Sequence, residues 1–447
     1  MNTFAASIAP AGSCKPKNRT MLRKLDRHLN LAALCLLLLT SLSLAAAGPH
    51  HTLIRSPEPG WPQWRGPYRD GISDETGLLQ QWPASGPHLL WKIENLGHGW
   101  SSPVITRGKI FITGDIGDDL TVFAFDTDAN LLWKTTNGNS WKRSYPGARA
   151  CCVFSEDRLY NLNAHGRLAC IDPASGKELW SLNILDRFDA KNITWAISEC
   201  LLVDRNNLIV TPGGKKALLA ALDKRTGSTV WTTPALENDA ASHSSPIIFT
   251  FAHRRIIATC SSAHGFAVDA DTGSLLFTVP LKNDYGTNIS TPILGFDCLY
   301  FVTPYAELGR LYRLTADSGD ISAKHLWTCP LDTVTGAGVL IGDTLCSAGY
   351  KTSKWWFAID WKTGKTRYEL KDLTTGSAIC ADNRLYCLDE KGTVALLELT
   401  DTGFATRGRF SIETGRYKDA WTHPVLLDGC LYIRQHETLY CYDVKAP

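Results

Sequence analysis

The segment Asp223-Lys224-Arg225-Thr226-Gly227-Ser228-Thr229-Val230-Trp231 decides the fold of this chain. An Asp side chain accepts hydrogen bonds from the N–H groups of a turn, and Gly tolerates a positive φ, so together they predict a tight β-hairpin. The Trp begins the next strand, where its ring can pack between neighbouring sheets. Short alternating apolar runs precede each such turn, as at 158–162 and 167–171, and predict units of four antiparallel strands.

The same spacing recurs through the chain. Further copies are Asp172-Gly176-Trp180, Asp269-Gly273-Phe277 and Asp360-Gly364-Tyr368, with weaker copies at positions 126, 315, 399 and 443. A period of about 45 residues with four strands per unit is typical of a β-propeller. The last copy lacks its Trp strand, whereas 87–93 is a Trp strand without a preceding copy. We therefore predict an all-β, eight-bladed β-propeller of four-stranded antiparallel blades, closed by an N-terminal strand that completes the C-terminal blade.

Composition agrees with this fold and narrows the function. Among 447 residues there are 15 Trp, 36 Gly and 21 Pro but only 2 Met, which favours short strands with many turns over long helices. A net charge of +2 argues against a nucleic-acid binder. The sequence has no C-x-x-C-H haem site, EF-hand loop, G-x-S-x-G elbow or zinc-spaced Cys and His set.

The first 47 residues have the layout of a secretory signal peptide. A basic stretch after Met21 leads into an apolar run from Leu29 to Leu44 and then a small-residue site at 45–48, and Met21 itself is a second candidate start. We expect residues 48–86 to form an N-terminal extension rich in Trp, Gly and Pro, and residues 87–447 to form the propeller. A retained membrane anchor is the less favoured alternative, because the run is short for a spanning helix.

Cleavage would change the charge and the cysteine count. Residues 1–47 hold six basic and one acidic residue, so the net charge becomes −3, and the cysteines fall from 14 to 12. We expect an exported protein, periplasmic or extracellular, soluble and without a membrane span after cleavage. In such a compartment a disulfide between Cys430 and Cys441 is predicted, if a turn at 435–436 places them opposite each other.

The Asp-x-x-Thr-Gly-x-x-x-Trp units resemble the tryptophan-docking repeats of pyrroloquinoline quinone (PQQ) propellers. The segment Trp61-Pro62-Gln63-Trp64-Arg65-Gly66-Pro67 and the later 86–91 are similar to exported bacterial proteins of the PQQ-binding-like β-propeller repeat family. The resemblance covers residues 61–447. That family includes quinoprotein dehydrogenases and cofactor-free scaffolds such as the outer-membrane assembly factor BamB, so the resemblance implies the fold more strongly than the function.

The segments that begin the inner strands are expected to surround one mouth of the central channel. The candidate binding residues there are Trp100, Arg149, Cys151, Cys152, Glu199, His243, Asn288, Trp421 and His423, with His98 and Trp195 nearby. This composition suits a flat, anionic, aromatic ligand or a loop of a protein partner. The alternative is that these residues only begin the strands.

Adjacent cysteines offer a second interpretation. Quinoprotein alcohol dehydrogenases are similar in having an adjacent cysteine pair that forms a disulfide against PQQ, which would give Cys151 and Cys152 a cofactor role. A dehydrogenase site would also hold Ca²⁺, for which Glu199 and Asn288 are the candidate ligands. No second carboxylate is found among the inner-strand starts. We therefore expect an exported, non-catalytic propeller that binds a ligand or protein partner at the channel mouth, and keep a PQQ- and Ca²⁺-dependent dehydrogenase of alcohols or sugars as the alternative.

Overall fold

The computed structural model describes residues 51–236, 239–305, 308–335, 337–413 and 419–447. The predicted signal peptide, residues 1–47, lies outside them. Strands dominate, and the helix α2 (Ile184–Phe188) is a single short turn after a blade strand. Within the described residues, no helix has the length and apolar character needed to cross a membrane.

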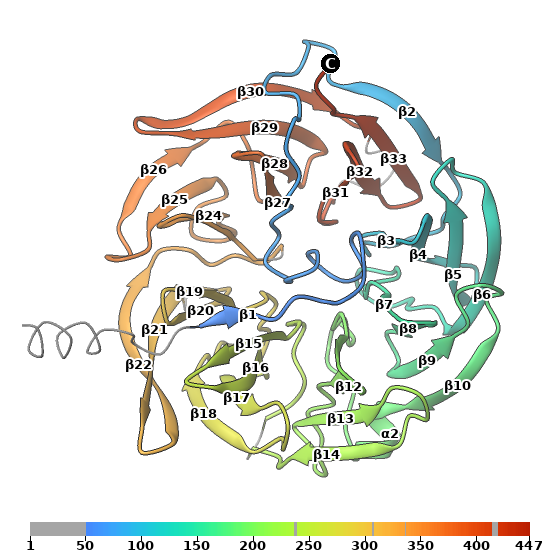
Figure 1. The fold of residues 1–447 in the computed structure, drawn as a ribbon, viewed down its shortest axis with the longest axis vertical. Coiled ribbons are helices and arrows are strands. Elements are labelled where there is room, and N and C mark those ends of the chain that lie inside the picture. The colour runs from blue at the N-terminus through green and yellow to red at the C-terminus, as the bar shows by residue number, and fades with distance from the viewer. Residues whose placement is uncertain (1–50, 237–238, 306–307, 336, 414–418) are drawn as a thin grey trace, which may run out of the picture. The chain divides into compact units, whose positions relative to one another are not determined.

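Eight antiparallel sheets are arranged as the blades of a propeller, which confirms the predicted fold (Figure 1). Blades 1 and 2 contain β3 (Val104–Thr106), β4 (Lys109–Ile116), β5 (Asp119–Asp126), β6 (Leu131–Asn139), β7 (Val153–Ser155), β8 (Arg158–Leu162), β9 (Arg167–Ile171) and β10 (Glu178–Asn183). Blades 3 and 4 contain β11 (Leu202–Asp204), β12 (Asn207–Val210), β13 (Leu219–Asp223), β14 (Thr229–Thr233), β15 (Ile247–Phe251), β16 (Arg254–Cys260), β17 (His264–Asp269) and β18 (Leu275–Pro280). The short strand β1 (Thr52–Leu53) adds to the inner edge of blade 4 beside β15.

The second half of the ring repeats this order. Blades 5 and 6 contain β19 (Ile293–Gly295), β20 (Cys298–Thr303), β21 (Leu308–Asp317), β22 (Asp320–Cys329), β23 (Val339–Ile341), β24 (Thr344–Ala348), β25 (Trp356–Asp360) and β26 (Thr366–Leu370). Blades 7 and 8 contain β27 (Gly376–Ala381), β28 (Arg384–Asp389), β29 (Thr393–Thr400), β30 (Gly403–Ser411), β31 (Val425–Leu427), β32 (Cys430–Gln435), β33 (Thr438–Asp443) and β2 (His88–Ile93). Apolar clusters lie between adjacent blades, so each interface is a core.

The repeated turn has the chemistry expected from the sequence. The Asp223 carboxylate accepts hydrogen bonds from the N–H groups of Arg225 and Thr226, and Gly227 has a φ of +72°. In four units the Trp packs over the turn glycine of the next blade, as Trp180 does over Gly227. The motif therefore closes a hairpin and links two blades at the same point.

Ring closure also follows the prediction, because β2 pairs with β33 in blade 8. Trp91 lies opposite Cys441, and its indole N–H donates to the Thr127 carbonyl of blade 1. The prediction that Cys430 and Cys441 lie directly opposite each other and form a disulfide was wrong. Cys430 lies opposite Asp443, Cys441 lies opposite Tyr432, and both thiols are free. The turn falls one residue later than expected, since Gln435 pairs with Thr438, and this makes the cysteines diagonal neighbours.

The N-terminal segment, residues 51–82, crosses the centre of the ring before β2 begins (Figure 1). It makes hydrogen bonds to all eight blades. Its partners, from blade 1 to blade 8, are Ile105, Phe154, Cys200 with Leu201, Pro246, Thr291, Ala337 with Gly338, Cys380 and Gly429. The extension is therefore an integral part of the propeller's centre.

Two fully buried arginines fix this segment. Arg65 donates to the carbonyls of Ala337 and Gly338, at 3.2 and 2.8 Å. Arg69 donates to the carbonyls of Pro246, Leu201 and Cys200, at 2.6, 2.9 and 2.7 Å, and so joins blades 3 and 4. Burial lowers the pKa of each guanidinium to about 10.

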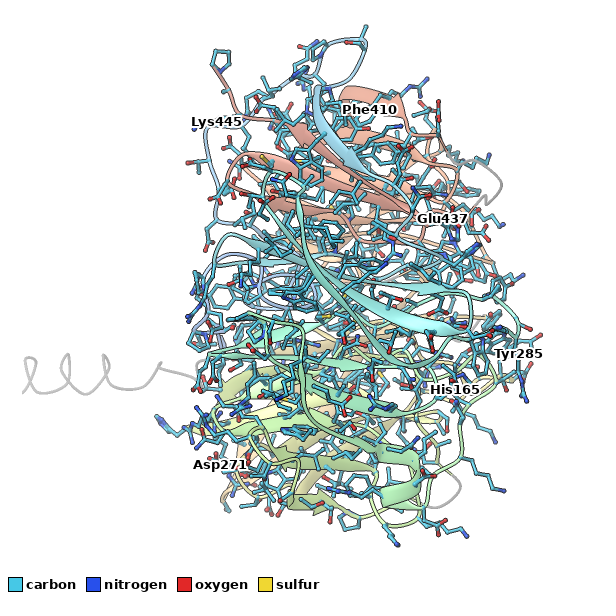
Figure 2. All side chains as sticks on the ribbon, turned by 90° about the vertical axis from the view of Figure 1, so that its right-hand side faces the viewer. His165, Asp271, Tyr285, Phe410, Glu437 and Lys445 are labelled. Atoms are coloured by element: carbon cyan, nitrogen blue, oxygen red, sulfur yellow. The ribbon has the colours of Figure 1, made fainter. Side chains whose placement is uncertain are left out.

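The two ends of the propeller differ. In side view, His165, Tyr285 and Glu437 lie toward one end, which we call the mouth face, and Asp271 and Lys445 lie toward the other (Figure 2). His165 and Glu437 belong to loops between the second and third strands of their blades, whereas Asp271 belongs to a repeated Asp-Gly turn. The channel cavity described next is lined by residues that begin the inner strands and by loops of the mouth face.

Candidate functional site

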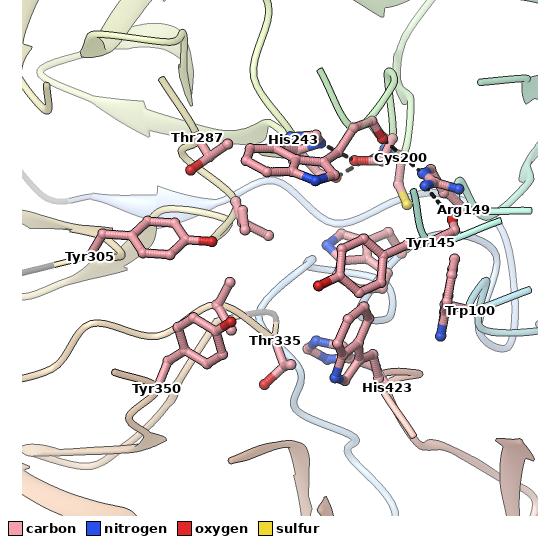
Figure 3. A pocket seen from close by; sticks show the side chains of 17 residues that line it. Trp100, Tyr145, Arg149, Cys200, His243, Thr287, Tyr305, Thr335, Tyr350 and His423 are labelled. Carbon is pink, nitrogen blue, oxygen red and sulfur yellow. Dashed lines mark hydrogen bonds between the residues drawn. The ribbon is translucent and has the colours of Figure 1, made fainter. Parts of the chain in front are cut away.

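A cavity of about 250 Å³ lies at the channel mouth (Figure 3). Seven of its lining side chains are aromatic: Trp64, Trp100, Tyr145, Trp195, Tyr305, Tyr350 and Trp421. Tyr305 and Tyr350 come from second-to-third-strand loops of blades 5 and 6, and Trp64 comes from the N-terminal segment. The others precede inner strands, so the cavity is assembled from nearly the whole ring.

The rings contact one another around the cavity. Trp100 stacks on Trp421 with centroids 5.6 Å apart, and Tyr305 meets Tyr350 edge to face at 5.8 Å. Trp64 lies 4.4 Å from the His423 ring, and its indole N–H donates to Thr291 Oγ1. Such mutual packing holds large side chains in place before any ligand arrives, which lowers the entropic cost of binding.

Arg149 supports the aromatic wall. Its guanidinium donates to the backbone carbonyls of Trp195, Gly147, Ser144 and Tyr145, at 2.6–3.3 Å. The group also lies 5.4 Å from the centroid of the Trp100 ring. Burial lowers its pKa to about 10, and Asp115 partly opposes that shift. Arg149 therefore holds the loop at 144–149 and positions Trp100.

The two lining histidines are neutral at pH 7. Burial and then the charge of Arg149 lower the pKa of His243 to about 4, and its Nδ1 lies 3.0 Å from Ser198 Oγ. Burial and the charge of Arg65 lower the pKa of His423 well below its ordinary value. The charge of a different guanidinium thus adds to the effect of burial at each histidine.

Two lining polar atoms have no hydrogen-bond partner within the described residues. They are Thr287 Oγ1 and Trp421 Nε1, whereas the His423 ring is hydrogen-bonded to the Thr335 backbone. Thr287 is 4% exposed. Because a buried polar group without a partner is costly, these atoms indicate where a ligand's hydrogen-bonding groups would lie.

The structure separates the residues named from the sequence into two groups. Trp100, Arg149, His243, Trp421 and His423 line the cavity, as does Trp195. Glu199, Asn288 and the adjacent cysteines lie within the walls, and His98 pairs with Glu437 outside the cavity. Strand alternation explains part of this division, since positions 198 and 200, or 287 and 289, face the cavity and the residue between them does not.

Glu199 and Asn288 have structural partners. The Glu199 carboxylate accepts the N–H and the hydroxyl of Thr211, at 2.8 and 2.5 Å, and burial raises its pKa to about 7. The Asn288 amide donates to the carbonyls of Ser261 and Leu281, at 2.7 and 3.1 Å. Both side chains therefore form their hydrogen bonds with neighbouring protein groups in the cavity walls.

The cysteines take part in hydrogen bonds between blades. The N–H of Ser102 donates to Cys151 Sγ, the N–H of Cys151 donates to Cys200 Sγ, and the N–H of Cys200 donates to Ser245 Oγ. Cys151 and Cys200 therefore occupy, in blades 2 and 3, the position that Ser102 and Ser245 occupy in blades 1 and 4. Cys151 and Cys152 are free thiols buried in the core between blades 1 and 2.

These residues do not fit a Ca²⁺-bound quinone. Ca²⁺ takes six to eight oxygen ligands, commonly with carboxylates, yet no carboxylate is among the described lining residues. In the same described part of the chain, no group of three or more His, Cys, Asp or Glu is placed to hold a metal. Arg149, the cation nearest the cavity, is engaged by backbone carbonyls.

Solved structures with the same fold serve different purposes. BamB from Moraxella catarrhalis matches with a TM-score of 0.59 at 13% identity, over 80% of this chain and 99% of that one. The quinohemoprotein alcohol dehydrogenase from Comamonas testosteroni matches with a TM-score of 0.57 at 14% identity, over 87% and 81%. The computationally designed Ika8 protein gives 0.56 at 12%, over 80% and 100%. These similarities establish the fold alone.

Sequence comparison is more specific. No curated protein matches the chain. The family model described as outer membrane protein assembly factor BamB matches residues 118–403, which is more than half of the sequence and runs from blade 1 into blade 7. The chain therefore belongs to the BamB family of PQQ-repeat β-propellers.

Proposed function

We propose that this protein is an exported, non-catalytic β-propeller that binds a ligand or partner in the aromatic cavity at its channel mouth. The observation that carries the proposal is the cavity itself, whose lining combines seven aromatic side chains with two unpartnered polar atoms. An apolar, concave lining with a few convergent polar groups is the usual character of a binding site. Export is inferred from the signal-like segment before residue 48.

The absence of an assembled catalytic set among the described residues supports binding over dehydrogenation. Glu199 and Asn288, the candidate Ca²⁺ ligands, point into the walls and are hydrogen-bonded there. Cys151 and Cys152 lie in a core outside the cavity lining. Arg149, the arginine among the described lining residues, already has four carbonyl partners, so the carboxylates of a quinone would find no free guanidinium there.

Both readings can be tested on the same purified full-length chain. We would add PQQ and Ca²⁺, measure cofactor binding by absorbance, and follow dye-coupled oxidation of alcohols and sugars. We expect neither saturable binding nor dye reduction. Dye reduction that is lost in Glu199→Ala would establish the dehydrogenase and refute the proposal.

The binding itself needs a positive readout. We would screen small molecules by their effect on thermal unfolding, because a ligand that binds only the folded state raises the midpoint. Trp421→Ala removes one wall of the cavity and is the matched non-binder. A hit that stabilises both proteins equally would bind elsewhere.

A further inference from the structure

We propose that the cavity binds one neutral saccharide ring, an inference that rests on the proposed binding function and names its ligand. The cavity volume is about 250 Å³. Pockets for drug-sized ligands run from about 300 Å³ upward, so this site suits a single six-membered ring better than an extended molecule. Three features of its lining then select the chemistry.

The first feature is the arrangement of aromatic faces. Trp100 and Trp421 form one stacked pair, and Tyr305 and Tyr350 form a second pair from other blades. Figure 3 shows the Tyr305 and Tyr350 side chains across the cavity from Trp100. An aromatic face carries partial negative charge, and the C–H groups on the face of a pyranose carry partial positive charge. The rings can therefore stack on a sugar without a charged contact.

The second feature is the set of unpartnered polar atoms. Thr287 Oγ1 is buried and unpartnered, and Trp421 Nε1, which is also unpartnered, can only donate. A purely apolar or aromatic occupant would leave both of them unpaired. Sugar hydroxyls both donate and accept, so one ring can form hydrogen bonds with the indole N–H and with the Thr287 hydroxyl together.

The third feature is charge. Burial keeps the two lining histidines neutral, and the charges of Arg149 and Arg65 lower their pKa further. An ammonium group entering the cavity would lose its hydration and meet the same two positive charges. A carboxylate would lose its hydration and find no free cationic donor among the described lining residues, because Arg149 already donates to four carbonyls. Both arguments favour a ligand without formal charge.

The test is a tryptophan-fluorescence titration of the full-length chain at pH 6 with glucose, N-acetylglucosamine and their β-1,4-linked disaccharides. Glucosamine is the matched charged ligand, because it differs from N-acetylglucosamine only at the nitrogen and is a cation at this pH. We expect saturable binding of at least one neutral sugar and at least tenfold weaker binding of glucosamine. Equal binding of glucosamine would overturn the argument from charge.

Variants separate the saccharide from other occupants. Thr287→Val removes the unpartnered hydroxyl at nearly constant volume and should weaken sugar binding about fivefold or more. Thr229→Val, on the exposed outer strand β14, is the matched control and should leave it unchanged. If indole or p-cresol binds and no neutral sugar does, the saccharide proposal falls and the binding function stands. If none of these ligands binds and the thermal screen is also blank, both fall.

Discussion

Replacing Arg69 by alanine should lower the free energy of unfolding by about 3–5 kcal/mol. The side chain is 1% exposed and donates to three backbone carbonyls of blades 3 and 4 and to Gln63 Oε1. Truncation leaves these carbonyls in a closed core, where each unpaired group costs roughly 1–3 kcal/mol. Truncation also removes a buried charge, whose pKa is already lowered to about 10, and the lost desolvation penalty offsets part of the destabilisation.

Urea unfolding monitored by tryptophan fluorescence measures the effect. With a slope of about 3 kcal/mol/M, the midpoint should fall by about 1–2 M. Arg69→Lys should recover little, because one ammonium cannot replace the planar fork that reaches Pro246, Leu201 and Cys200 together. The control is Arg205→Ala in blade 3, one of the two blades that Arg69 contacts. Arg205 is exposed and paired with Asp271, and the expected change is below about 0.5 kcal/mol. An Arg69→Ala midpoint as close to wild type as that of the control would refute the structural role assigned to the N-terminal segment.

Other perturbations test the repeat, the buried titratable groups and export. Gly273 has a φ of +74°, and an added Cβ would lie 2.3 Å from the Trp231 ring, so Gly273→Ala should cost about 2–4 kcal/mol of unfolding free energy. The control is Gly108→Ala, with a φ of +71° but open space around the added Cβ, which should cost about 1 kcal/mol. Equal urea midpoints for the two variants would contradict the packing of Trp231 on Gly273. The unfolded chain takes up a proton at His243 between pH 6.5 and about 4, so acid should destabilise the wild type more than His243→Asn in urea titrations at each pH. Glu199 gives the opposite pH dependence. Its raised pKa of about 7 stabilises the fold fully below pH 4.5, and that contribution is lost as pH rises through 7. Glu199→Gln should therefore lose less stability than the wild type over this range. Mass spectrometry of the protein from its producing cell should find an N-terminus near residue 48, and a retained Met1 or Met21 would refute cleavage.

The repeat could be read from sequence because its information is local. Asp223, Gly227 and Trp231 form one turn and one contact between blades, and the recurrence of the same spacing predicts the same contact in other blades. Ring closure followed from two unmatched ends, Trp91 and the final copy at Asp443. Neither inference needed knowledge of how distant side chains meet.

The site was only partly predictable. The repeat register located Trp100, His243 and Trp421, because equivalent positions precede inner strands. Register alone does not say which of two consecutive side chains faces the channel, so Glu199 and Asn288 were included although Ser198 and Cys200, or Thr287 and Ile289, line the cavity. That choice depends on the first residue of each strand, which tertiary packing sets.

Tyr305, Tyr350 and Trp64 could not be located from the repeat. The two tyrosines lie in loops whose lengths differ from blade to blade, outside the repeated turn. Trp64 reaches the cavity because residues 51–82 cross the ring, and that path is held by contacts with blades far along the chain. Arg65 and Arg69 were the available signal that this segment is buried, since an arginine in such an aromatic and apolar stretch of sequence is rarely buried unless it is paired with polar groups of the protein.

The cavity exists only when the ring is closed. Its lining comes from the N-terminal segment and from blades that span the chain, and ring closure depends on β2 joining β33 in blade 8. Arg65 and Arg69 place Trp64 at the cavity while they donate to backbone carbonyls of three blades, 3, 4 and 6. A ligand that binds this assembled lining must stabilise the closed propeller by its own binding free energy. Mutations in the segment should therefore weaken binding and stability together, whereas Thr287→Val should weaken binding alone.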